Sequence, residues 1–123
     1  MTLPINSPSV SVTAFNPNTG TAGTVAVAAP VKGYVIRLLA ALGAQTVGTA
    51  DNTLTGKING VAMVHDTWKQ PTSGSAAYEI DGVNASPLAP ANYVSVGDSI
   101  QFSSDGAGSN TTPTTFTALI RMA

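Results

Sequence analysis

Residues 53–64 read TLTGKINGVAMV and contain the strongest turn signal in the chain. Asn59 and Gly60, near the middle of this stretch, form the dipeptide that most readily adopts the two positive-φ conformations of a tight hairpin turn. Apolar side chains lie on both sides of the pair, with Ile58 immediately before it and Val61 immediately after it. The stretch therefore predicts a β-hairpin that turns at Asn59-Gly60.

The rest of the chain likewise consists of short runs of β-branched residues separated by Gly, Asn, Asp and Pro. Alternation of apolar and polar residues is typical of strands that bury one face. Strands are expected at residues 9–15, 24–29, 34–39, 76–80 and 114–122, and on either side of a turn at Gly97-Asp98. Residues 16–23 are expected to form a plain loop, and residues 81–92 a long connection. The pattern predicts an all-β domain.

The most apolar stretch is residues 31–42, VKGYVIRLLAAL. Leu and Ala favour a helix over its second half, but the bracketing Gly33 and Gly43 favour a strand at residues 34–39. Strict alternation places Tyr34, Ile36 and Leu38 on one face and Val35, Arg37 and Leu39 on the other. Arg37 then needs water or an ionic partner, so we expect an edge-facing cation or one half of an ion pair at a subunit interface.

Charged residues make up only 9% of the sequence, against about 25% in typical domains. Five Lys and Arg stand against six Asp and Glu, and the cations are scattered, which counts against nucleic acid or a membrane as partner. Hydrophobic residues amount to 43% but aromatic residues to 6%, so the core must consist mainly of Val, Ile, Leu and Ala. The low content of charged residues and the small number of aromatic residues in the core favour a surface that other subunits partly cover.

The sequence offers little catalytic chemistry. It has no Cys and a single His, which excludes disulfides, thiolate zinc sites and cysteine nucleophiles. His65 and Asp66 are adjacent, and adjacent residues of a strand point to opposite faces, so they are not expected to act as a catalytic pair. The acids at positions 51, 81, 98 and 105 sit beside Gly or Asn, where Asp caps turns; a calcium site built from them is the alternative. We expect no enzyme, no cofactor and no small-molecule substrate.

Two further regions are candidates for contacts. Trp68 is the only tryptophan, and we expect it to cap the core or to be buried at a subunit contact, with a sugar-stacking platform as the alternative. Residues 1–9 hold two prolines and no periodicity, so they predict an extended arm before a domain at residues 10–123. The arm is either a frayed terminus or a segment that orders on a neighbour. It lacks the pattern of a signal peptide, which predicts synthesis and retention in a cytoplasm.

Two segments carry a resemblance to a known family. They are residues 50–61, ADNTLTGKINGV, and residues 91–106, ANYVSVGDSIQFSSDG. Together with the apolar strand that precedes them and the Thr-rich last strand that ends at Ile120-Arg121, they resemble small structural proteins of tailed bacteriophages. The chain looks like a capsid decoration (cement) protein over about its last three-quarters.

The resemblance implies both a fold and a function. It implies a single antiparallel β-sandwich, of the jelly-roll type, that binds the outside of the head as a homotrimer. The partner is then the major capsid protein at three-fold or quasi-three-fold positions, where the trimer holds neighbouring capsomers together. The expected location is the outer capsid surface of the virion, after synthesis in the cytoplasm of the host bacterium. It implies no catalytic residues.

The contact residues are expected in two places. The arm matches no motif of the family, and its Leu3, Pro4 and Ile5 are the residues that we expect to touch the capsid. Arg37 and Trp68 are expected at the subunit interface.

A protein of a different class fits some of the same residues. In a receptor- or carbohydrate-binding tip domain of a phage tail fibre or spike, Trp68, Tyr78 and Tyr93 would form a sugar site with the Asn- and Gly-rich loops. Such tips usually follow a long fibrous shaft, which 123 residues do not provide. The decoration protein is therefore the preferred hypothesis.

Overall fold

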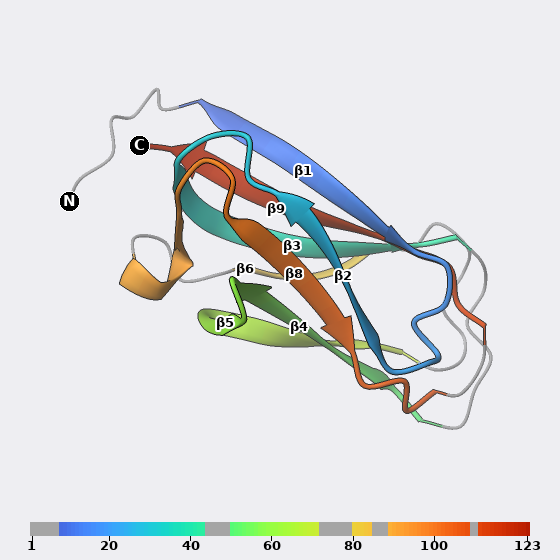
Figure 1. The fold of residues 1–123 in the computed structure, drawn as a ribbon. Helices are drawn as coiled ribbons and strands as arrows, with labels where there is room; N and C mark the ends of the chain where they lie inside the picture. The colour runs from blue at the N-terminus through green and yellow to red at the C-terminus, as the bar shows by residue number, and fades with distance from the viewer. Residues whose placement is uncertain (1–7, 44–49, 72–79, 85–88, 109–110) are drawn as a thin grey trace.

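Strands are the main secondary structure of the chain that the structure describes. The computed structural model describes residues 8–43, 50–71, 80–84, 89–108 and 111–123, and among them the only helix is the single 3-10 turn η1 (Pro90–Asn92). The strands form two antiparallel sheets that pack against each other (Figure 1). The predicted all-β antiparallel sandwich is therefore confirmed.

The two sheets divide the strands in an interleaved order. The first sheet holds β1 (Ser9–Asn16), β3 (Gly33–Leu42), β6 (Ile80–Asn84), β7 (Tyr93–Val94) and β9 (Thr114–Met122). The second sheet holds β2 (Gly23–Ala28), β4 (Asn52–Ile58), β5 (Val61–Gln70) and β8 (Ser99–Ser104). The order is β1-β9-β3-β6 in the first sheet, with β7 also paired to β3, and β2-β8-β4-β5 in the second. The chain therefore crosses repeatedly from one sheet to the other.

The predicted hairpin is the β4–β5 pair. Asn59 has φ 50° and Gly60 has φ 83°, which are the two positive values that a type I′ turn requires. Ile58 pairs with Val61 across this turn. The hairpin predicted at Asn59-Gly60 is thus confirmed.

The alternation predicted for residues 34–39 is wrong. Val35 and Leu38 are both fully buried, although three positions separate them. The pairing of β3 with β9 shifts register between Val35 and Arg37, so Ile36 is the extra residue of a β-bulge, which reverses the inward and outward positions after it. The strand itself, and its preference over a helix, are confirmed.

The core lies between the sheets and is centred on three aromatic rings. Phe116 from β9 stacks on Phe102 from β8 with centroids 4.9 Å apart. Trp68 from β5 meets the same Phe116 ring edge-on at 6.3 Å. Aliphatic side chains from both sheets fill the surrounding space, among them Val35, Leu38, Leu54, Ile100 and Ile120, each 0% exposed. The burial of Phe116, Ala118 and Ile120 confirms the face predicted for the last strand.

Two connections differ from the prediction. Residues 80–84 were expected to fall mostly in a long connection, but they form β6, which pairs with β3 from Arg37 to Ala41. Most of the strand predicted at residues 76–80 lies outside the described residues. The strands on either side of Gly97-Asp98 exist, but β7 belongs to the first sheet and β8 to the second. The turn therefore joins the two sheets.

One end of the sandwich is closed by a buried polar network. Thr19, in the loop between β1 and β2, donates its hydroxyl to Gln70 Oε1 at 2.7 Å. The same oxygen accepts Asn52 Nδ2 at 2.8 Å, and Gln70 Nε2 donates to Thr114 Oγ1 at 2.9 Å. All four side chains are at most 4% exposed, so their polar groups depend on one another for hydrogen bonds. We call this the polar end.

Candidate functional site

The outward surface of the first sheet is broad and carries little charge. In β9 the residues between buried Phe116, Ala118 and Ile120 point outward, and the strand pairing extends these positions into rows across β1 and β3. The outward residues are Ser9, Ser11, Thr13 and Phe15 in β1, Thr115, Thr117, Leu119 and Arg121 in β9, and Tyr34, Arg37, Leu39 and Ala41 in β3. We call this set the first outer face. Only its two arginines are charged.

Phe15 is the most prominent apolar side chain on the first outer face. It is 59% exposed, and it lies in one row with Thr115 and Ala41. The next rows add Leu39 and Leu119, which are half-buried. The positions directly around Phe15 on this face are Thr13, Thr115 and Thr117. A large exposed ring on a surface with so little charge is a candidate contact for a protein partner.

Arg37 is exposed on this same face, in one row with Leu119. Among the described residues no carboxylate forms an ion pair with it. Arg37 therefore reaches water from an interior strand, since β3 pairs with both β9 and β6, and the predicted edge-facing position is wrong. The predicted ion pair with another subunit stays a prediction. An exposed arginine on a sheet surface with little other charge can supply directional hydrogen bonds to a carboxylate of a neighbouring molecule.

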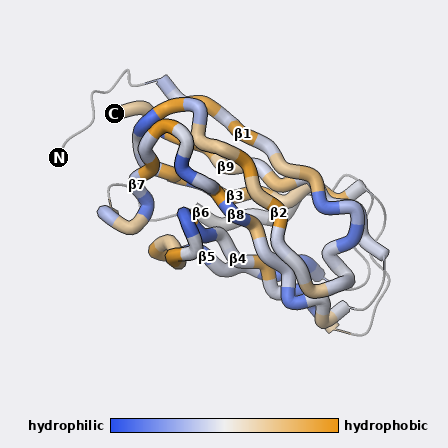
Figure 2. The backbone as a smooth tube through the Cα atoms, viewed as in Figure 1, coloured by the Kyte–Doolittle hydropathy of each residue, from blue (hydrophilic) through white to orange (hydrophobic). Residues whose placement is uncertain are grey.

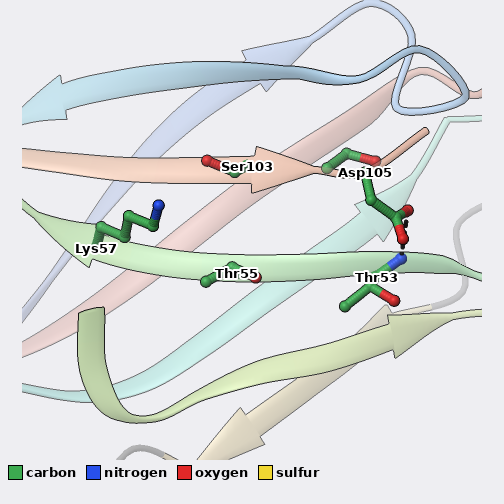
Figure 3. Close-up of a pocket in the computed structure, with 6 residues that line it drawn as sticks. Thr53, Thr55, Lys57, Ser103 and Asp105 are labelled. Carbon is green, nitrogen blue, oxygen red and sulfur yellow. Dashed lines mark hydrogen bonds between the residues drawn. The ribbon is translucent and has the colours of Figure 1, made fainter. Parts of the chain in front are cut away.

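The second sheet presents a very different surface, with a shallow hollow of about 280 Å³. Figure 3 shows the hollow between β4 and β8. Hydroxyl groups dominate its lining, with one cation and one carboxylate, and the lining residues are Thr53, Thr55, Lys57, Ser103, Ser104 and Asp105. We call the outward surface of this sheet the second outer face.

Polar groups of the second outer face are bonded to one another. Lys69 Nζ donates to Thr53 Oγ1 at 2.6 Å, and the hydroxyls of Thr24 and Ser103 lie 2.8 Å apart. Asp105 Oδ1 accepts the backbone N–H of Thr53 at 2.9 Å. That hydrogen bond is the main cause that holds the pKa of Asp105 below its ordinary value, with a smaller contribution from the Lys69 charge. Among the residues that line the hollow, Thr53, Ser103 and Asp105 therefore already have hydrogen-bond partners within the subunit.

The described acidic side chains do not gather into a metal site. No three His, Cys, Asp or Glu of the described residues come together as such a site would require. His65 lies in β5, but its side chain is outside the described part, as is that of Asp81. Asp98 accepts the backbone N–H of Ser95 at 2.8 Å, and this hydrogen bond lowers the pKa of Asp98. Asp98 and Asp105 therefore act as turn caps, the first of the two roles expected for the loop acids.

Of the aromatic residues proposed for a sugar site, the described Trp68 and Tyr93 do not form an open platform. Trp68 is 7% exposed inside the core, where its Nε1 has no hydrogen-bond partner among the described residues. It thus has the first of its expected roles, that of a core residue, and little of the ring is left for a subunit contact. Tyr93 packs edge-on against Tyr34 at 5.1 Å. Tyr78 lies outside the described residues.

The arm residues expected to touch the capsid, Leu3, Pro4 and Ile5, also lie outside the described residues. The point where the arm leaves the domain is fixed, because the carbonyl oxygen of Pro8 accepts the backbone N–H of Met122 at 2.9 Å. β1 begins at Ser9, within one residue of the predicted boundary. The arm therefore departs beside the end of the last strand.

The end of the sandwich where the arm departs also collects exposed valines, and we call it the terminal end. Figure 1 shows the start of β1, the C-terminus, η1 and the β4–β5 turn at this end. Val61 follows the hairpin turn and is 64% exposed, Val96 lies in the turn before β8 and is 69% exposed, and Val64 near η1 is 40% exposed. Sequence reasoning missed this group because it assigned Val61 and Val96 to ordinary strand alternation.

Comparison with protein-family models, with curated proteins and with solved structures found no match for this chain. No helix among the described residues has the length and apolar character needed to cross a membrane.

Proposed function

We propose that this chain is a structural virion protein of a tailed bacteriophage. In this proposal a homotrimer binds the outer surface of the capsid and stabilises the contacts between capsomers of the major capsid protein. The observation that carries the proposal is the first outer face, a broad sheet surface on which only Arg37 and Arg121 are charged. A surface with so few charged groups can be buried against a companion with little charge to desolvate.

The strand order gives independent support to the jelly-roll part of the proposal. With short β7 left aside, each sheet has four strands, and the order β1-β9-β3-β6 faces the order β2-β8-β4-β5. A jelly roll is a double sheet of eight antiparallel strands in which the chain moves back and forth between the sheets. The resemblance of residues 50–61 and 91–106 to decoration proteins points to the same type of domain.

The chemistry of the surface fits a passive role. Asp98 and Asp105 serve as turn caps, and Lys69, Thr53 and Asp105 on the second outer face are bonded within the subunit. Stabilisation of a shell needs only contact area shared between capsomers, because each bound copy favours the assembled state by mass action. The residues assigned to the contacts remain Leu3, Pro4 and Ile5 for the capsid, with Arg37 and the first outer face for the subunits.

The first test of the proposal is the mass of the protein in solution. Native mass spectrometry and light scattering at micromolar concentration should give about 37 kDa, three chains of 12.3 kDa each. Electron microscopy of intact particles should then show density for this protein outside the shell, at three-fold or quasi-three-fold positions. A stable monomer would reject the trimer, and particles without this density would reject the capsid role.

The tip domain of a tail fibre or spike is the second candidate. It receives less support from the side-chain positions, since Trp68 is buried and Tyr93 packs against Tyr34. The hydroxyl-lined hollow on the second outer face is the one described feature that favours it. A glycan array with no bound sugar would remove this candidate, and a specific hit that is lost in Lys57→Ala would favour it over the capsid role.

A further inference from the structure

We infer that Asn59 is a modification site, where the side chain loses ammonia and becomes a carboxylate, and that hydrogen bonds to β8 control the rate. Asn59 is the only asparagine of the sequence that Gly follows. Because Gly60 has no side chain, its backbone nitrogen can approach the side-chain carbonyl carbon of Asn59 with little steric hindrance. The modification does not depend on the proposed function.

The reaction needs water as its only co-reactant. The Gly60 nitrogen attacks Cγ of Asn59, the new N–Cγ bond closes a cyclic imide, and the Cγ–Nδ2 bond breaks. Nδ2 leaves as ammonia, together with the proton that the Gly60 nitrogen gives up. Water then opens the ring at one of its carbonyl carbons and leaves aspartate or isoaspartate at position 59. Both residues are exposed, and no atom lies within 4 Å of the place where a Cβ of Gly60 would be, so water has access.

Hydrogen bonds to β8 oppose this attack in the folded protein. Asn59 donates its backbone N–H to Ser99 O and accepts the Ser99 N–H on its side-chain oxygen, both at 2.8 Å. The N–H of the attacking Gly60 nitrogen is donated to Gln101 Oε1, also at 2.8 Å. We call these three hydrogen bonds the β8 clamp. The attack requires the Asn59 side chain to turn and the Gly60 nitrogen to release its proton, so the clamp has to open first.

The carboxylate that the reaction creates conflicts with Asp98. In the folded protein the pKa of Asp98 is lowered first by the Ser95 N–H and then by a hydrogen bond from the Asn59 side chain. A carboxylate at position 59 has no hydrogen atom to donate, and like charges side by side repel each other. The start of β5, directly after the turn, is strongly hydrophobic (Figure 2) and leads to buried Met63. A loosened turn therefore admits water beside the core.

The test follows the full chain by mass spectrometry during incubation at mildly alkaline pH. Trypsin releases residues 58–69, which contain Asn59 and no other Asn or Gln, so conversion of amide to acid in this peptide reports on one residue. The wild type should react more slowly when it is folded than when it is unfolded in urea. Gln101→Ala removes the acceptor of the Gly60 N–H and should raise the rate about fivefold, the change in open population expected for one hydrogen bond.

The matched control is Ser103→Ala, because Ser103 lies on the same strand and its hydroxyl contacts Thr24 and not the turn. This variant should react at the rate of the wild type. Asn59→Asp places the product in the chain directly. Its melting temperature should be lower than that of the wild type at pH 7, and the difference should shrink below about pH 4, where carboxylates take up protons.

Each part of the inference can fail separately. Equal rates for the folded and the unfolded wild type, or for Gln101→Ala and Ser103→Ala, would overturn the role of the β8 clamp. An unfolded chain that keeps its amide at position 59 would overturn the modification site itself. If Asn59→Asp melts as the wild type does at every pH, the conflict with Asp98 does not exist. The proposed function is unaffected by any of these results, because none of them measures binding or assembly.

Discussion

The two outer faces of the sandwich are both built from antiparallel strands, but they differ in whether their polar side chains are hydrogen-bonded within the subunit. On the second outer face, Lys69, Thr53 and Asp105 are joined by hydrogen bonds within the subunit. On the first outer face, no hydrogen bond of the described chain joins the hydroxyls of Thr13, Thr115 and Thr117, and the exposed ring of Phe15 lies beside them. The difference indicates that a partner covers the first outer face and not the second.

Both faces depend on one core, so the largest effect is expected from a change that removes their common support. Phe116 lies behind the first outer face and touches both Phe102 and Trp68. Phe116→Ala should lower the free energy of unfolding by about 3–5 kcal/mol, through lost transfer energy and the cavity left behind. Urea unfolding should show one transition in both proteins, with the midpoint of the variant much lower.

The matched change is Phe102→Ala, which removes the partner ring behind the second outer face. A similar loss is expected, since the two rings stack on each other and both are fully buried. A loss below about 1 kcal/mol in either variant would contradict a shared core, because truncation of a buried phenylalanine normally costs several times more.

The second prediction separates the two faces directly. Phe15→Asp replaces the exposed ring of the first outer face by a charge, and Ala26→Asp places the same charge on an exposed position of β2, in the second sheet. In the proposed trimer Phe15→Asp should raise the dissociation constant at least about tenfold, because an unpaired charge would be buried. Sedimentation velocity at a series of concentrations would measure this.

The stability of each isolated subunit should change little, since both side chains are exposed and surface substitutions usually stay within about 0.5 kcal/mol. Dissociation caused by Ala26→Asp, with Phe15→Asp still trimeric, would reverse the assignment of the faces.

Local pattern was enough to predict several elements of this structure. The Asn59-Gly60 turn needs two positive φ values, and few other dipeptides supply them so readily. β9 alternates without interruption from Thr114 to Met122, so its buried face could be predicted residue by residue. Where the chemistry of single residues determines the backbone, sequence reasoning was sufficient.

Other features depend on partners that are distant in sequence. The bulge at Ile36 exists because β3 must stay in register with β9 on both sides of it. Residues 80–84 contain Gly and Asn, which locally favour turns, yet pairing with β3 makes them a strand. The loop at residues 16–23 looks like a plain connection, and nothing in its composition indicates that Thr19 would be buried against Gln70. The exposure of the valines could not be predicted for the same reason, because a side chain stays exposed when no distant segment of the chain packs over it.

The smallest expected effect concerns the acid of the second outer face. The folded protein lowers the pKa of Asp105 mainly through the Thr53 N–H hydrogen bond, whereas in the unfolded chain the pKa should be near 3.9. A lowered pKa in the folded state means that the carboxylate adds stability above about pH 4 and that this contribution disappears as the pH falls through the folded value. Because the side chain is exposed, the contribution should stay below about 1 kcal/mol.

Asp105→Asn keeps an acceptor for the Thr53 N–H but removes the charge. Thermal melts should therefore show a slightly lower stability than wild type at pH 7, with the difference shrinking towards pH 2. The mass in solution should not change at either pH where the protein is folded, because this carboxylate bonds within its own subunit. If Asp105→Asn instead dissociates the oligomer while its melting temperature stays constant, the carboxylate must be bonded to a neighbouring subunit. The second outer face would then be the covered one, and the contrast between the two faces would no longer identify the interface.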